Sequence, residues 1–151
     1  MREYISYSQV GMFLRCGEQY RQRYIENRVI PPAIAMIKGS AVHKGAELNW
    51  KQKIDTKKDL SKNDIVDLSV IALEERARED LFLSEDEKTI GKDNLIGAAK
   101  DSVVSIAGLY ADTMAPAIQP LHSEMMIDTI SAGIRSRPLS TWWTIRTSSG
   151  T

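Results

Sequence analysis

Apolar and aromatic residues recur at helical spacing along most of the chain, and turn-forming residues separate these segments. The first segment carries them three or four positions apart, at Phe13, Cys16, Tyr20 and Tyr24. Ser6 or Ser8 can cap it. The pattern predicts a helix that runs to about Ile25. Pro31-Pro32 then predicts an extended break, because neither proline can donate a backbone hydrogen bond.

Three more helices are predicted after the prolines. The first begins near Gly39 or Ser40 and continues through Trp50 into a lysine-rich end. The next opens at Ser61, which with Asp64 resembles a capping box, and the last ends at Pro116. The Ser61 helix is predicted to bury Val66, Val70, Leu73, Ala77 and Leu81, and one side of the last helix carries Leu95, Ala99, Ser102, Ile106, Tyr110 and Thr113.

The remaining segments predict loops and the start of a sheet. Residues 83–93 (LSEDEKTIGKD) are typical of a polar loop. Residues 121–130 (LHSEMMIDTI) have the mixed pattern of a first strand, and residues 131–133 (SAG) predict a turn. Residues 135–151 contain no acidic side chain and little pattern. We therefore expect one domain in residues 1–134, with its strand near 121–130, and a non-native or disordered tail over 135–151.

Charge is balanced overall but unevenly distributed. Residues 1–60 carry a net charge of +5, residues 61–130 of −8 and residues 131–151 of +3. The basic end could face phosphate, although solvated helix faces explain the same asymmetry. Cys16 is the single cysteine, which excludes an internal disulfide. No apolar run reaches the roughly 18 residues that a membrane span needs, so we expect a cytoplasmic protein without membrane contact.

Two linked motifs near the start carry a resemblance. Residues 4–25 (YISYSQVGMFLRCGEQYRQRYI) contain a Cys-x-x-x-Tyr-x-x-x-Tyr spacing, and after a proline-containing linker residues 39–43 read GSAVH. Together they resemble the opening of the RecB-like branch of the PD-(D/E)XK nucleases. The resemblance covers residues 4–50 and is loose over 51–130. It implies an α/β fold of the restriction-endonuclease type, of which this chain holds the mostly helical N-terminal part and at most the first strand or hairpin.

The resemblance also implies chemistry. In such nucleases Mg or Mn ions drive hydrolysis of DNA phosphodiesters, in repair, recombination or phage DNA processing. DNA is the implied partner, with a helicase or recombination protein. His43 matches the family's metal-binding histidine. Taken alone, one histidine on a helix is more often a core or surface residue. Glu47, one turn later, is interpreted as a solvated helix residue.

The acidic residues of that family have no match in the chain. Its site needs an aspartate on one strand and Glu/Asp-x-Lys on the next, followed by Gln-x-x-x-Tyr. The acidic-x-Lys string at Asp86 to Lys88 falls in the predicted polar loop and is rejected as catalytic. We therefore expect a truncated nuclease that is inactive alone. The alternative is a non-catalytic helical module that binds DNA or a protein.

Cys16 and the basic residues of the first segment carry two further expectations. In AddB-like and CRISPR adaptation nucleases, a cysteine at this place joins three C-terminal cysteines around a 4Fe-4S cluster, so Cys16 is a cluster ligand in a longer parent or a small core residue here. Cations interleaved with aromatic rings suit a single-stranded DNA path, although core tyrosines and solvated arginines are the plain alternative. The predicted DNA-binding residues are Arg15, Tyr20, Arg21, Arg23, Tyr24 and Lys44, with Arg28 and Lys38 nearby.

The tail suggests a reading-frame artefact. Trp142-Trp143-Thr144 can be encoded only as TGG TGG ACN, because tryptophan has one codon. Reading from the third base of each codon gives Val-Asp at that point and allows a second aspartate before it. An aspartate-bearing strand is due here in the nuclease family. We expect a frame shift between about Ile130 and Leu139 and a protein that continues in the other frame.

Overall fold

The computed structural model describes residues 5–121, 129–131, 134–136 and 145–146. The protein is mostly helical, with very little sheet. It divides into two compact units. The first comprises Met1–Ile30 with Glu124–Trp143, and the second comprises Pro31–Ser123 with Thr144–Thr151. None of the helices in the described part combines the length and the apolar character needed to cross a membrane.

The first unit begins with a well-capped helix. The Ser6 side chain accepts a hydrogen bond from the Gln9 backbone at 3.3 Å, and Gln9 Oε1 accepts one from the Ser6 backbone at 2.6 Å. This reciprocal pair satisfies two backbone N–H groups at the helix start. Ser6 is therefore the cap, and Ser8 is not. The helical elements are α1 (Tyr7–Arg15), α2 (Gly17–Tyr20) and the π-helix η1 (Arg21–Ile25).

Cys16 interrupts what the sequence predicted as one helix to Ile25. Its backbone is extended, with φ −159° and ψ 105°, so α1 ends there and α2 begins at once. Gly17 follows, and glycine contributes little to helix continuation. The apolar spacing could not reveal this break, because Phe13 and Tyr20 still meet across it with ring centroids 5.5 Å apart.

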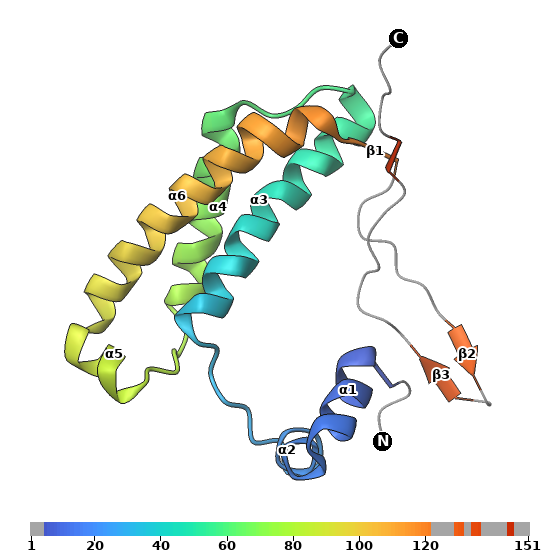
Figure 1. Cartoon of the computed structure of the whole chain (residues 1–151), viewed down its shortest axis with the longest axis vertical. Helices are drawn as coiled ribbons and strands as arrows, with labels where there is room; N and C mark the ends of the chain where they lie inside the picture. The colour runs from blue at the N-terminus through green and yellow to red at the C-terminus, as the bar shows by residue number, and fades with distance from the viewer. Residues whose placement is uncertain (1–4, 122–128, 132–133, 137–144, 147–151) are drawn as a thin grey trace. The chain divides into compact units, whose positions relative to one another are not determined.

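In the second unit, three long helices lie side by side, with α4 antiparallel to α3 and α6 (Figure 1). Its elements are α3 (Ile34–Thr56), α4 (Lys62–Ala77), α5 (Glu85–Ile90), α6 (Lys92–Ala117), β1 (Gln119–Pro120) and β4 (Ile145–Arg146). The predicted cap is confirmed, since the Ser61 side chain accepts from the Asp64 backbone at 3.1 Å. The extended break at Pro31-Pro32 is also confirmed.

Three predicted boundaries are wrong. Helix α3 begins at Ile34, more than a turn before Gly39, because the second proline leaves residues 34 onward free to form a first turn. The predicted loop over 83–93 contains α5, which opens with a capping box between Ser84 and Glu87. Pro116 lies inside the last turn of α6 instead of ending it.

The core lies between α3, α4 and α6 in two clusters. One holds Ile34, Ile37, Ala41, Leu73, Ala99 and Val103, and the other Ala46, Trp50, Ile65, Ala107, Tyr110 and Ala115. On α4 the predicted Leu73 and Ala77 are buried, whereas Val66 and Val70 are only partly so. On α6 the predicted Ile106 is 48% exposed, because the face of α6 that packs in the core carries Ala99, Val103 and Ala107.

Short strands complete both units. In the first, β2 (Thr129–Ser131) pairs antiparallel with β3 (Ile134–Ser136), with Ser131 opposite Ile134. In the second, β1 pairs antiparallel with β4. Of the strand predicted over 121–130, residues 122–128 lie outside the described residues. Most of the predicted tail also lies outside them, so its non-native character stays a prediction.

Candidate functional site

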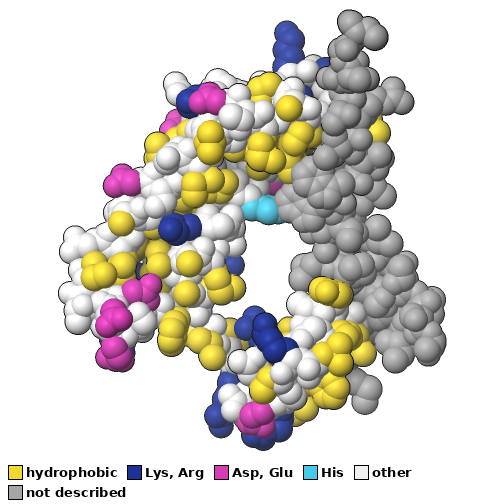
Figure 2. Space-filling model, viewed as in Figure 1, with side chains coloured by type: hydrophobic (Ala, Val, Ile, Leu, Met, Phe, Trp, Pro, Cys, Tyr) yellow, Lys and Arg dark blue, Asp and Glu magenta, His cyan; other side chains and the backbone are white. Residues whose placement is uncertain are grey.

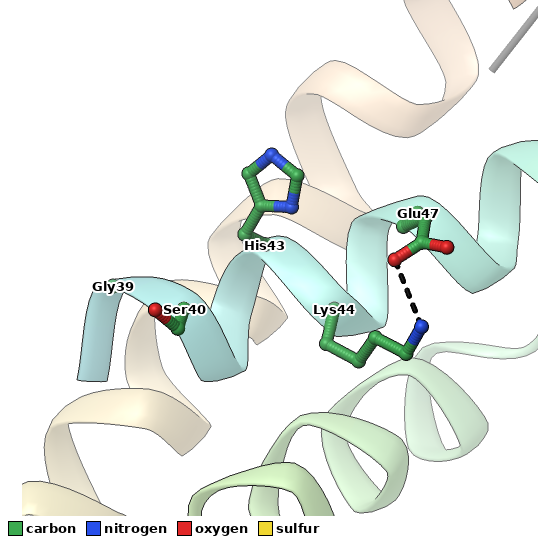
Figure 3. A pocket seen from close by; sticks show the side chains of 5 residues that line it. All are labelled: Gly39, Ser40, His43, Lys44 and Glu47. Atoms are coloured by element: carbon green, nitrogen blue, oxygen red, sulfur yellow. Dashed lines mark hydrogen bonds and ion pairs between the residues drawn. The ribbon is translucent and has the colours of Figure 1, made fainter. Parts of the chain in front are cut away.

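Helix α3 carries the GSAVH motif on its surface. Gly39 and Ser40 lie three or four residues before His43 and Lys44, and these in turn lie three or four residues before Glu47, so the five residues are neighbours on one side of the helix. These five residues line an open pocket of about 480 Å³ (Figure 3). The gathering follows from helical spacing, which is why the sequence could predict it.

Glu47 is the most constrained residue of this pocket. Its residue is 5% exposed, and its carboxylate accepts from Lys44 Nζ at 2.9 Å and also pairs with Lys51 Nζ. Burial raises the pKa of Glu47, but the hydrogen bonds from Lys51 and Lys44 outweigh it and hold the pKa below its usual value. The interpretation of Glu47 as a solvated residue is therefore wrong. Lys44 and Lys51, at i−3 and i+4 from Glu47, were the sequence feature from which these ion pairs could have been predicted.

His43 is half-buried and projects from α3 one turn before Glu47. Figure 3 shows its imidazole pointing away from the Lys44–Glu47 pair. The His43 imidazole therefore does not compete with Lys44 for the Glu47 carboxylate. Lys44, predicted to contact DNA, is instead committed at least in part to Glu47.

The donor set around His43 does not fit a catalytic metal. Within the residues that the structure describes, no three His, Cys, Asp or Glu side chains gather closely enough to hold an ion. Glu47, the nearest carboxylate along α3, is neutralised by two lysines. Divalent ions such as Mg and Mn need several oxygen ligands. This chain alone cannot hold a 4Fe-4S cluster either, because the cluster needs four thiolates and Cys16 supplies one.

The basic residues of the first unit differ in how far they are engaged. Arg21 binds both carboxylate oxygens of Glu18 and also pairs with Glu26. Hydrogen bonds from Arg21, with one from Gln22, lower the pKa of Glu18 to about 2. Arg23 lies 5.9 Å from the centre of the Tyr24 ring. Arg15 is exposed and makes no ion pair with any described residue. Of the predicted DNA-binding arginines, Arg21 is therefore the least available.

A second polar cluster lies at the far end of α3 and was not predicted. Lys53 Nζ donates to Asp59 at 2.7 Å and to the Ala115 carbonyl at 2.6 Å. Asn49, fully buried, donates to Asp59 and to the Tyr110 hydroxyl. Burial raises the pKa of Tyr110. Asn49 and Lys53 flank Trp50 on an otherwise apolar face of α3. From that position their burial could have been predicted. The cluster ties α3, its following loop and α6 together.

No protein-family model, no curated protein and no solved structure matches this chain. The resemblance to RecB-like nucleases therefore rests on the motifs of residues 4–50 and remains a prediction.

The ion pairs of Glu47 predict an acid-dependent contribution to stability. Because the folded pKa is lowered, the stabilisation is present above the ordinary carboxyl pKa of about 4 and is lost as the pH falls through the folded value. Glu47→Gln should lower the free energy of unfolding by about 2 kcal/mol at pH 7. In urea titrations this difference should shrink below pH 4. The matched exposed variant Glu75→Gln should change stability little at any pH, and equal effects of the two would contradict the assignment.

Proposed function

We propose that this chain is the helical N-terminal part of a RecB-like PD-(D/E)XK DNA nuclease, whose complete domain is α/β. The observation that supports this best is the pocket on α3, where His43 stands beside the small residues Gly39 and Ser40. The GSAVH motif needs that combination: a histidine on a helix, with room in front of it for further ligands.

The chain contributes a scaffold and one ligand in this proposal. In the parent protein, Mg or Mn would supply the activated water and stabilise the leaving oxygen. The described residues do not complete such a site, so the carboxylates have to come from strands that follow. The three-helix bundle would hold His43 at a fixed place relative to them, because rigid helices position ligands more accurately than loops do.

A non-catalytic helical module that binds DNA or a protein is the second candidate. The engagement of Glu47 with Lys44 and Lys51 favours it, because a carboxylate paired with two cations is a poor metal ligand. Both candidates bind a macromolecule through this chain, and they differ only in whether acidic strands complete the site.

This chain should not degrade DNA. A single imidazole cannot fix a divalent ion for catalysis without carboxylates. Linear DNA incubated with the chain and Mn²⁺ is expected to remain intact on a gel. Degradation that disappears in His43→Ala would show that this chain already carries a full site.

The two candidates separate in the coding DNA. If the nuclease proposal holds, the alternative frame after about codon 130 encodes an Asp, then Glu/Asp-x-Lys, then Gln-x-x-x-Tyr. A protein expressed from that restored frame should degrade DNA with Mn²⁺, and His43→Ala should abolish the activity, whereas Gln52→Ala further along α3 should not. A stop codon, or a frame without these acids, would leave the binding module as the function.

A further inference from the structure

The first unit contains a small pocket that the proposed metal chemistry does not use. Ile5, Gln9, Val10, Phe13 and Tyr20 line it, and its volume is about 260 Å³. Phe13 is 59% exposed, and Ile5 and Val10 are also exposed. Helix α1 and the segment after it therefore leave an aromatic and aliphatic surface open, where Figure 2 shows hydrophobic side chains beside Lys and Arg.

Phe13 belongs to a run of contacting aromatic rings. It meets Tyr20 edge-on at 5.5 Å, and Tyr20 lies 5.1 Å from Tyr24. The Arg23 guanidinium lies 5.9 Å from the centre of the Tyr24 ring, at the end of the run away from Phe13. Tyr20 therefore lies between the other two rings and packs against Phe13, and both Phe13 and Tyr20 line the pocket. Held aromatic rings with an open member are the usual platforms for stacking a planar ligand.

Gln9 adds a polar group to this apolar pocket. The residue is 4% exposed, and its Oε1 is used by the Ser6 backbone in the capping box. None of the hydrogen bonds among the described residues uses its Nε2 group. This Nε2 group is not among the fully buried atoms without a partner, so it is still reached from the pocket. It can donate a hydrogen bond to a ligand that presents a carbonyl oxygen or ring nitrogen.

The surroundings of the pocket favour an anionic ligand. Arg15 is the last residue of α1, two positions after Phe13, and is exposed, as are Arg23 and Arg28. In residues 5–30 there are four arginines and two glutamates, and both glutamates pair with Arg21. Arg28 also pairs with Glu26, at 3.1 Å. Arg15 and Arg23 make no ion pair with a described residue, so they are the cations of this segment that can bind the phosphate of a stacked nucleotide.

We propose that this pocket holds one unstacked base of single-stranded nucleic acid, a step that rests on DNA being the substrate of the proposed nuclease. The base stacks on Phe13 and Val10, its edge accepts a hydrogen bond from Gln9 Nε2, and its phosphate is neutralised by Arg15. Duplex DNA cannot enter, because both faces of each base are covered by neighbours. An apolar peptide side chain would fill the space but leave Gln9 and the arginines unused.

The test is binding of a fluorescein-labelled oligothymidylate of roughly 15 nucleotides, measured by anisotropy without metal. The single strand should bind more tightly than the matched duplex, and affinity should fall with salt. Phe13→Ala should weaken single-strand binding about 5- to 100-fold. Gln9→Glu should weaken it about tenfold, since glutamate keeps the capping box but removes the donor.

Two variants serve as controls. Leu14→Ala removes a 77% exposed apolar side chain of the same helix that does not line the pocket, and Gln19→Glu adds the same charge in α2 outside it. Leu14→Ala should weaken single-strand binding less than Phe13→Ala does, and Gln19→Glu should weaken it less than Gln9→Glu does. Equal losses in Phe13→Ala and Leu14→Ala, or in Gln9→Glu and Gln19→Glu, would overturn the proposal, as would equal duplex binding or no binding. The nuclease proposal fails separately, through the coding frame and His43, because this assay uses neither metal nor cleavage.

Discussion

Gly45→Ala is expected to destabilise the bundle of α3, α4 and α6 by about 3 kcal/mol. A Cβ atom at Gly45 would lie 2.0 Å from Ser69 Oγ and 3.0 Å from the backbone oxygen of Ile65. Ser69 is fully buried, and its hydroxyl already donates to Ile65 at 2.8 Å. The hydroxyl could turn away only by losing that bond, and the carbonyl could retreat only if the two helices separated. Urea unfolding followed by circular dichroism measures the loss.

Two further variants make the Gly45 prediction specific. Gly97→Ala, on α6 with nothing within 4 Å of its new Cβ, should raise stability by roughly 0.5–1 kcal/mol, because alanine favours helix. Ser69→Ala removes the closest contact and should recover part of the Gly45→Ala loss, giving a coupling of at least about 0.5 kcal/mol. If Gly45→Ala behaves like Gly97→Ala, the close approach of α3 and α4 does not exist in solution.

Helix starts could be predicted where a serine cap marks them, because that signal is local, whereas the start of α3, which has no side-chain cap, was predicted wrongly. Ser61 caps the helix that the sequence assigned to it, and Ser6 is one of the two caps that the sequence offered for the first helix, since a cap depends on a side chain and a backbone group three residues apart. The same signal was present at Ser84 and Glu87, where a polar composition concealed a capping box. The pocket on α3 was equally predictable, because spacing along one helix brings its residues together.

Which side of a helix is buried could not be read from apolar spacing alone. Ile106 belongs to an apolar band on α6, but Val103 and Ala107 face the other helices and Ile106 does not. Polar residues mislead in the opposite direction: Ser69 is buried because a glycine on α3 lets α4 come close. Such choices depend on contacts between distant segments, which periodicity does not encode.

Asp59→Ala is expected to cost about 3 kcal/mol, because it leaves the buried ammonium of Lys53 without its carboxylate. The Lys53 side chain is 6% exposed, and its remaining partner is the Ala115 carbonyl. Asn49 would lose an acceptor as well. Asp112→Ala provides the matched control. This variant breaks the ion pair between Asp112 and Lys62. Both side chains of that pair are more than half exposed, so the loss should be less than about 1 kcal/mol.

The double variant Lys53→Met, Asp59→Ala distinguishes an unpaired charge from a simple loss of packing. Methionine keeps an apolar stem in the space of the lysine chain and carries no charge, so the double variant should be more stable than Asp59→Ala alone. Its remaining deficit reflects the Ala115 carbonyl and Asn49, which lose donor and acceptor respectively. Should Lys53→Met add to the loss, the ammonium would be solvated in the Asp59→Ala protein. The end of α3 would then be open to water, and the cluster would not be what ties α3 to the end of α6.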